Sequence, residues 1–536
     1  MQKRRIDVLC DALDDFGRGI VRVDGKAVFV PDLLPGERAT IETVFSFGKM
    51  KECRLLSRKN DSPDRVKPSC PYYPRCGGCQ LMHFSYPAQL LFKKRKVEHL
   101  LRKFAKVDIQ AEPTCGLEEP MRYRNKVQKP IRKVRGKICA GFYKTGTHDL
   151  VNVVDCLAET ELSAKITNEV LYLMRKFHYV PYDEDEETGD VRHLLIKVSS
   201  VYDEALVTLV VLDSNLPGRR AFAQELMAKI PEVKGVVFNV NSRKTNVILG
   251  EKDVPVFGAT RIRDRIFDKD FYISTHSFYQ TNPLQIERLY KTAIDLSGAG
   301  KDDVVLDAYC GTGTIGLSIA DRVKEVLGVE IVPEAVEDAK ENARMNNVQN
   351  ARFLCKDCTE YLQSGKRKFD IVIMDPPRKG STPEFLSALR KIHPRRIVYV
   401  SCDPATLARD VSLLKEDYLV EKVVPVDMFP NSLHVETVVL LSQQKPDDTI
   451  EIDLDLDELD ATAAETKATY EEIKAYVWEK CHLKVSNLYV SQIKRKCGLE
   501  VGQNYNLSKS ENPKVPKCPP EKEAAIMDAL KHFQMI

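Results

Sequence analysis

The chain has 536 residues, of which 43% are hydrophobic and 30% are charged. That length exceeds what one hydrophobic core serves, and it predicts about three to four domains. No apolar run approaches the roughly 18 residues of a membrane span, and the first residues lack the apolar core of a signal peptide. We therefore expect a cytoplasmic protein with no membrane partner. Its 15 cysteines are then expected to serve metal binding or catalysis rather than disulfides.

The formal net charge of +3 hides an asymmetry along the chain. Residues 447–536 carry 17 acidic and 12 basic side chains, so residues 1–446 carry a net charge of +8. Residues 122–137 hold eight basic side chains and no acid, in an alternation that suits a β-hairpin turning at Arg135-Gly136. Residues 92–106 form a second basic cluster, expected on a helix. Such clusters indicate a polyanion partner, although a solvated surface explains either one equally well.

In chain order, residues 1–60 show short β-like runs separated by Asp-Gly and Pro-Gly turns, which predicts a small OB-like β-barrel. Residues 61–265 form a basic, cysteine-rich block expected to be a central α+β domain. From 266 to 443, apolar strands alternate with helical patterns, which is typical of a Rossmann-like α/β domain. An acidic linker (444–461) and a small helical extension (462–536) follow. The fold class is therefore expected to be multidomain.

The α/β block contains a nucleotide motif. Residues 304–317 have the pattern of a strand, a glycine turn and a helix, in which missing side chains let the backbone approach a bound nucleotide. Glu330 ends the next strand, where an acid can accept the two ribose hydroxyls. A dinucleotide site is the alternative, but the glycine order here favours S-adenosylmethionine, which has no phosphate. Asp375 ends a third strand before Pro376-Pro377, like the substrate-side wall of many methyltransferases; a purely structural turn is the alternative.

Cys402 follows the apolar strand 396–400 in the same block. A thiolate is needed when the carbon to be methylated is not itself nucleophilic. C5 of uracil fits this case, because sulfur addition at C6 turns C5 into an enolate carbon that attacks a methyl donor. A half-buried cysteine at a strand end explains Cys402 better when it is taken alone. Combined with the nucleotide motif, it predicts a methyltransferase with a cysteine nucleophile.

A second group of cysteines precedes the α/β block. Cys70, Cys76 and Cys79 lie close together among Pro and Gly turns, and Cys156 follows downstream. Cysteines this close in a cytosolic protein can surround one metal centre. Thiolates suit both zinc and an iron-sulfur cluster, so the spacing leaves both open. The spacing is not the C-x3-C-x2-C of a radical enzyme, and we expect a structural or RNA-positioning role.

Four motifs resemble the RNA uracil-5-methyltransferase family over roughly residues 5–443. They are FYQTN (278–282), MDPPRKG (374–380), SCDPATLARD (401–410) and HVETVVLL (434–441). Residues 17–37 are similar to a TRAM domain, and the resemblance is specifically to the bacterial 23S ribosomal RNA branch, which carries a TRAM domain and a [4Fe-4S] cluster.

The resemblance implies roles for individual residues. Cys402 is the expected nucleophile at uracil C6, and Glu436 is the expected base that removes the C5 proton. The implied contacts to S-adenosylmethionine are Gln280, Tyr309, Glu330, Asp357 and Asp375. The implied cluster ligands are Cys70, Cys76, Cys79 and Cys156. We expect a monomer that methylates 23S ribosomal RNA; the transfer RNA version of the reaction, and an inactive RNA-binding protein on the same fold, are the alternatives.

Overall fold

The computed structural model describes residues 2–46, 49–184, 186–243, 247–365, 367–444, 470–497, 499, 518–533 and 535–536. The chain divides into two compact units, Met1–Asp447 and Asp448–Ile536. Beyond residue 444, the expected acidic linker lies outside the described residues. Within the described ranges, no helix has both the length and the apolar character needed to cross a membrane.

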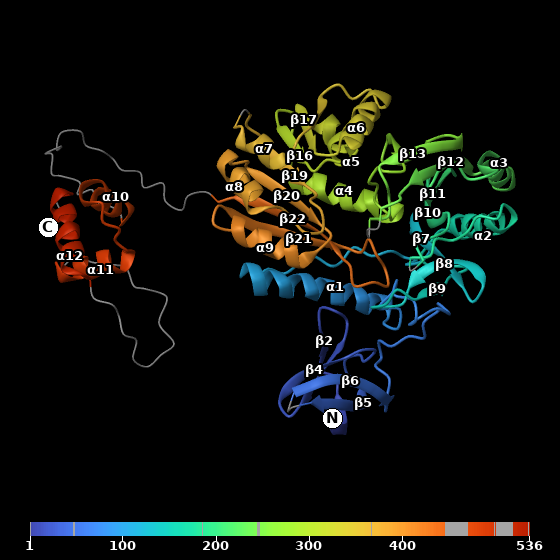
Figure 1. The fold of residues 1–536 in the computed structure, drawn as a ribbon, viewed down its shortest axis with the longest axis horizontal. Coiled ribbons are helices and arrows are strands. Elements are labelled where there is room, and N and C mark those ends of the chain that lie inside the picture. The colour runs from blue at the N-terminus through green and yellow to red at the C-terminus, as the bar shows by residue number, and fades with distance from the viewer. Residues whose placement is uncertain are drawn as a thin grey trace. The chain divides into compact units, whose positions relative to one another are not determined.

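The N-terminal residues form a small all-β domain around a core of its own (Figure 1). One sheet has the order β1 (Gln2–Leu9), β5 (Arg38–Ser46), β6 (Lys49–Arg58), and the other has the order β2 (Ala12–Leu13), β3 (Gly19–Val23), β4 (Lys26–Val30). Asp24 and Gly25 both have positive φ angles, 49° and 75°, as the two-residue turn between right-twisted strands requires. The short β-like runs expected within residues 1–60 are confirmed as strands.

The central residues build a seven-stranded sheet of order β13-β12-β11-β10-β7-β8-β9. Its strands are β7 (Lys126–Val134), β8 (Lys137–Tyr143), β9 (Leu150–Asn152), β10 (Val191–Val198), β11 (Ala205–Val211), β12 (Val233–Val240) and β13 (Lys252–Gly258). Helices α2 (Glu161–Lys176) and α3 (Arg219–Lys229) pack on it. The predicted hairpin is confirmed, because Arg135 and Gly136 join β7 to β8 with φ angles of 49° and 80°.

A second seven-stranded sheet has the order β18-β17-β16-β19-β20-β22-β21, and it confirms the predicted Rossmann-like α/β fold. The first five strands are parallel, and β22 runs antiparallel between β20 and β21. The strands are β16 (Val304–Ala308), β17 (Glu325–Glu330), β18 (Ala351–Cys355), β19 (Ile371–Met374), β20 (Arg396–Ser401), β21 (Tyr418–Val426) and β22 (Glu436–Gln443). The helices are α4 (Pro283–Ser297), α5 (Thr314–Ile319), α6 (Pro333–Met345), α7 (Cys358–Gln363), α8 (Pro383–Ile392) and α9 (Pro404–Leu414).

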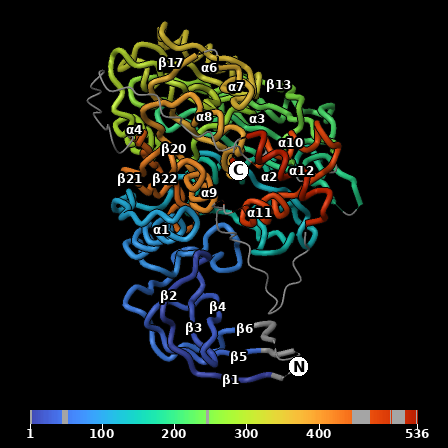
Figure 2. Tube along the Cα trace, turned by 90° about the vertical axis from the view of Figure 1, so that its left-hand side faces the viewer, coloured from blue at the N-terminus to red at the C-terminus, as the bar shows by residue number. Residues whose placement is uncertain are grey.

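Helix α1 (Tyr86–Leu100) belongs by sequence to the expected central domain, yet it packs on the α/β layer. Val97 and Leu100 of α1 share a core with Leu407 and Val411 of α9. In both views α1 runs alongside α9 and β21 (Figures 1 and 2). The hairpin of β14 (Arg261–Ile266) and β15 (Lys269–Ser274) likewise adds residues to the core of the α/β layer. Packing therefore crosses the boundaries expected from the sequence.

The two basic clusters are only partly surface features. Lys93 of α1 is fully buried and ion-paired with Asp427, and Lys129 of β7 is fully buried and ion-paired with Glu159. The interpretation of both runs as continuous basic surfaces was therefore wrong at these positions. Helical and strand periodicity turns some members of any charged run inward, where each then needs an opposite charge.

The described residues of the second unit form three helices, α10 (Tyr470–Cys481), α11 (Asn487–Lys496) and α12 (Pro520–His532). Their apolar faces make a separate core that includes Ile473, Val490 and Ile526. Each of these side chains is at most 2% exposed, because the helices cover one another's apolar faces. This small helical unit thus has a hydrophobic core of its own.

Candidate active site

The residues expected to act in catalysis and cofactor binding gather at one edge of the parallel sheet. Carboxyl ends of parallel strands meet at a common edge, and ligands bind there, where the strand order reverses. That reversal falls between β16 and β19. The residues at or directly beyond these strand ends are Tyr309 (β16), Glu330 (β17), Asp357 (β18), Asp375 (β19) and Cys402 (β20).

The glycine turn after β16 is tied to Glu330. The Glu330 carboxylate accepts hydrogen bonds from the backbone N–H of Gly311 at 3.1 Å and of Val332 at 3.0 Å. Gly313 has a φ of 79°, and a Cβ there would lie 2.8 Å from the ring of Phe353. Apart from Gly311 and its two chain neighbours, no atom of the described residues lies within 4 Å of the position a Cβ would take there. The backbone is therefore open to a ligand beside the Glu330 carboxylate.

Asp357 and Asp375 complete the acidic rim of this edge. Asp357 caps α7, because one of its oxygens accepts from Thr359 N at 2.8 Å and Glu360 N at 3.1 Å. Burial raises the pKa of Asp375 to about 7. Tyr309 lies beside the rim, with its hydroxyl 3.4 Å from Ser381 Oγ.

Gln280 lies in the loop between β15 and α4 and is 5% exposed. The same loop reaches both sides of the candidate site. Ser274 at its start donates to Asp338 of α6 at 3.4 Å, and Asn282 at its end donates to the carbonyl of Met428 at 3.1 Å. The assignment of Gln280 to the cofactor site stays a prediction.

Cys402 and Glu436 are brought together by an antiparallel register. Ser401, the last residue of β20, pairs with Thr437, so the next residues outward on the two strands are Cys402 and Glu436. Burial, together with the charges of Glu436 and Asp375, raises the pKa of the Cys402 thiol to about 12, although Arg378 acts to lower it. The thiolate therefore needs a nearby cation or a change on substrate binding to form at neutral pH.

Glu436 is a buried acid with a free oxygen. Its side chain is 3% exposed, and its Oε2 atom has no hydrogen-bond partner among the described residues. Burial raises the pKa of Glu436 well above the usual value, and Asp375 adds to this shift. Such a group is suited to accept a proton from a carbon held beside it.

The loop after β19 is fastened to α9. Arg409 donates to the carbonyl of Lys379 at 2.9 Å and to that of Ser381 at 3.0 Å, and Asp410 accepts from Ser381 N at 2.8 Å. Asp403 caps the same helix by accepting from Ala405 N at 2.9 Å. These contacts hold the loop after β19 and the turn after β20 against α9.

Arg378 and His434 stand at the mouth of the site, and the sequence interpretation assigned neither a role. Both are exposed, and the Arg378 guanidinium lies 2.7 Å from Nδ1 of His434. The protein atoms packed around the ring partly desolvate it although an edge stays exposed, and this, with the positive charge of Arg378, lowers the pKa of His434 to about 4. Arg378 follows the Pro-Pro turn directly, and that position was the available signal.

The four cysteines of the predicted metal set line one cavity of about 470 Å³. Burial raises the pKa of Cys79, and the nearby thiols of the other three cysteines also act to raise it, giving a pKa of about 12. Across the described ranges, however, no three or more His, Cys, Asp or Glu side chains are placed to hold a metal ion. The predicted metal site is therefore not shown, and the zinc alternative gains no support. Four thiols lining one cavity are a donor set whose chemistry suits an iron-sulfur cluster as well as zinc.

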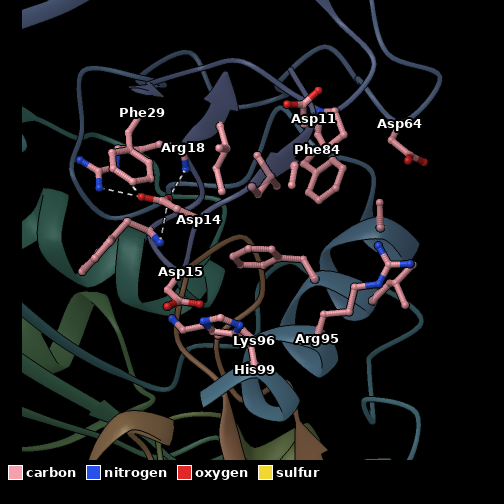
Figure 3. Close-up of a pocket in the computed structure, with 18 of the residues that line it drawn as sticks. Asp11, Asp14, Asp15, Arg18, Phe29, Asp64, Phe84, Arg95, Lys96 and His99 are labelled. Atoms are coloured by element: carbon pink, nitrogen blue, oxygen red, sulfur yellow. Dashed lines mark hydrogen bonds and ion pairs between the residues drawn. The ribbon is translucent and has the colours of Figure 1, made fainter. Parts of the chain in front are cut away.

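A groove of about 720 Å³ separates the N-terminal domain from α1. Figure 3 shows Arg18 and Phe29 of that domain on one side, and Arg95, Lys96 and His99 of α1 on the other. The guanidinium carbon of Arg18 lies 4.8 Å from the centre of the Phe29 ring. Aromatic faces stack on bases and cations bind phosphates, so the groove has side chains that suit nucleic acid, although aspartates also line it.

A Rossmann-like sheet with a glycine turn and acids at its carboxyl edge, and a thiol beside a buried acid, define an S-adenosylmethionine-dependent methyltransferase. Comparison with known proteins makes this more specific. A family model described as tRNA (Uracil-5-)-methyltransferase matches residues 85–444, and a TRAM domain model matches residues 1–44. The chain belongs to the tRNA (uracil-5-)-methyltransferase family, with an N-terminal TRAM domain, and is an RNA methyltransferase.

Similar proteins cover about four fifths of the chain. A protein of Bacillus cereus named an uncharacterized RNA methyltransferase is 40% identical over 448 residues, which is 82% of this chain and 96% of that protein. A Clostridium tetani protein with the same name is 41% identical over 431 residues, covering 80% and 94%. The crystal structure of Pyrococcus abyssi tRNA (uracil-54, C5)-methyltransferase with S-adenosyl-L-homocysteine has a TM-score of 0.65 and 28% identity, covering 81% and 99%.

Proposed function

We propose that this protein, as a monomer, methylates C5 of a uridine in 23S ribosomal RNA, with Cys402 as nucleophile and Glu436 as base. The register that pairs Ser401 with Thr437 is the observation that carries the proposal. This register supports the proposal because Cys402 and Glu436 then follow one another across two neighbouring strands at the ligand-binding edge, and Oε2 of Glu436 has no hydrogen-bond partner among the described residues. Each is needed for a separate step of the same reaction.

In this proposal the cofactor is held by Gln280, Tyr309, Glu330, Asp357 and Asp375. S-adenosylmethionine supplies an electrophilic methyl group when it is bound there. Glu330 has the position of a ribose acceptor and keeps the glycine turn in place through the N–H of Gly311. The open backbone at Gly311 leaves room for close approach.

The chain's own residues then act in order. The target uridine leaves its base stack and enters the site, and the Cys402 thiolate adds to C6, which makes C5 an enolate carbon. Arg378 is the cation that favours this thiolate. After C5 has gained the methyl group, Glu436 takes the C5 proton, the C5–C6 double bond forms, and the C6–S bond breaks to return the thiolate.

We further propose that Cys70, Cys76, Cys79 and Cys156 hold a [4Fe-4S] cluster. The support is the shared cavity and the four-thiol donor set. Such a cluster would cross-link two chain segments that are about 80 residues apart in sequence, which is a structural contribution. No step of the proposed reaction uses it.

The choice of 23S ribosomal RNA is supported by the TRAM domain together with the cysteine set, which the resemblance associates with the ribosomal branch of the family. Transfer RNA is a second candidate, because the similar Pyrococcus abyssi enzyme is titled a tRNA (uracil-54, C5)-methyltransferase. Both candidates share the chemistry at Cys402 and differ in the RNA that the rest of the protein selects.

The test is to incubate the protein with S-adenosylmethionine and 5-fluorouridine-substituted 23S ribosomal or transfer RNA. Fluorine at C5 cannot leave as a proton, so the reaction stops at the covalent adduct. We expect mass spectrometry to find a methylated RNA adduct on Cys402 with the ribosomal transcript, and none with Cys402→Ser. An adduct with transfer RNA alone would mean that transfer RNA, and not 23S ribosomal RNA, is the substrate. Absence of adduct with both RNAs, in a protein that binds them, would favour the inactive RNA-binding alternative.

A further inference from the structure

The segment from Asp427 to Val435 leads directly into Glu436, and α1 contacts it at several points. We propose that Gln89, Lys93 and Lys96 of α1 are positioning residues for Glu436, which set the rate of C5 proton removal rather than that of methyl transfer. The inference rests on the proposed function, since it assumes that Glu436 is the base. It gives a role in the reaction to residues outside the α/β domain.

The centre of the segment is held by a pair of amides. Asn431 N donates to Gln89 Oε1 at 3.0 Å, and Gln89 Nε2 donates to Asn431 Oδ1 at 3.1 Å. Gln89 is 1% exposed, so it cannot contact RNA. Asn431 has a φ of 64°, a left-handed conformation that is costly for most residues and needs support from its surroundings. The amide pair supplies that support at the sharpest bend of the segment.

Both ends of the segment are anchored to α1 as well. Lys93 Nζ donates to Asp427 Oδ1 at 2.5 Å and to the carbonyl of Phe429 at 3.0 Å. Lys96 Nζ donates to the carbonyl of Leu433 at 3.0 Å, three residues before Glu436. One helix therefore fixes the whole approach to the base, from the end of β21 to the start of β22.

The cysteine segment reaches the same bend. The backbone N–H groups of Gln80 and Leu81, directly after Cys79, donate to the carbonyl of Asn431 at 3.0 and 2.9 Å. Cys79, which lines the cysteine cavity, is thus only one and two residues away from the two N–H groups that hold the segment. Order in residues 70–81 is transmitted to the base through Asn431.

Cys402 is held differently. It follows β20, and the hydroxyl of Ser401 and the Asp403 cap of α9 order the turn around it. None of these hydrogen bonds involves the segment that α1 anchors. A loosened segment therefore displaces Glu436 while Cys402 keeps its place, and a displacement of about 1 Å can slow a proton transfer by up to about 100-fold.

The experiment follows a single turnover with unmodified RNA and S-adenosylmethionine, and measures formation and decay of the SDS-stable methylated adduct separately. In Gln89→Leu and Lys96→Met, with RNA at a saturating concentration so that the groove contact of Lys96 does not limit binding, we expect decay to slow by about tenfold or more, with adduct formation near the wild-type rate. Glu436→Gln, which lacks the proposed base, gives the slowest decay rate expected and serves as the reference for the other variants. Gln224→Leu and Lys229→Met are matched controls on the exposed surface of α3 and should leave both rates unchanged.

Three outcomes would overturn the inference. Equal slowing of formation and decay would mean that α1 supports the whole site. Unchanged decay in the folded variants would mean that α1 does not position the base. Rapid decay in Glu436→Gln would mean that Glu436 is not the base. The error would then lie in the proposed function and not in the role assigned to α1. Circular dichroism checks folding, and Lys96→Met carries the test if the buried Gln89→Leu variant does not fold.

Discussion

Replacing Lys93 by methionine tests how much the buried ion pair stabilises the first unit. The side chains of Lys93 and Asp427 are both 0% exposed, and among the described residues the one other side-chain donor to Asp427 is the hydroxyl of Tyr86, at 2.9 Å. Methionine keeps most of the lysine volume, so the cavity contribution is small. The substitution leaves a buried carboxylate without its cation, and such a change costs about 3–5 kcal/mol of unfolding free energy.

The assay is urea unfolding with two probes. Far-ultraviolet circular dichroism is dominated by the larger first unit, whereas the only tryptophan, Trp478, lies in α10 of the second unit. We expect Lys93→Met to lower the dichroism midpoint and to leave the fluorescence midpoint unchanged, because α10 packs in a separate core. The second probe therefore serves as a control within the same molecule.

A second substitution isolates the charge. Asp427→Asn in the Lys93→Met background removes the uncompensated carboxylate, and it should recover a large part of the lost free energy. A loss below about 1 kcal/mol in the single variant, or no recovery in the double variant, would refute the argument that an unpaired buried charge dominates.

Three further predictions concern the site. Cys402→Ser should abolish RNA methylation but keep S-adenosylhomocysteine binding by calorimetry; residual turnover would exclude the proposed nucleophile. Glu330→Ala removes the carboxylate that orders Gly311, so it should weaken S-adenosylhomocysteine binding by about tenfold or more, about 1.4 kcal/mol. An unchanged Kd would argue against a role of Glu330 and the glycine turn in cofactor binding. Glu436→Gln should lower the pKa of Cys402, because the Glu436 charge raises it. Iodoacetamide alkylation should then rise at lower pH than in the wild type, and an identical pH profile would contradict their proximity.

The sequence alone determined the α/β fold and the residues at its ligand-binding edge. Glu330, Asp375 and Cys402 each follow an apolar run that forms a strand, and parallel strands bring their carboxyl ends to one edge. A residue at the carboxyl end of a predicted parallel strand can therefore be assigned to the ligand-binding edge from the sequence alone. The motif beginning at His434 likewise contained Glu436, and the antiparallel register brings that residue beside Cys402.

Only the tertiary structure decided what surrounds these residues. The sequence placed Lys93 in a basic surface run, but its partner Asp427 is 334 residues away, and the pair is fully buried. Periodicity indicates which residues share a face of α1, but it carries no information on what that face meets. The same limit applies to Gln89, whose amide contact with Asn431 arises only because α1 packs against the α/β layer. Contacts between distant segments depend on the packing of the whole core, and that packing decided them.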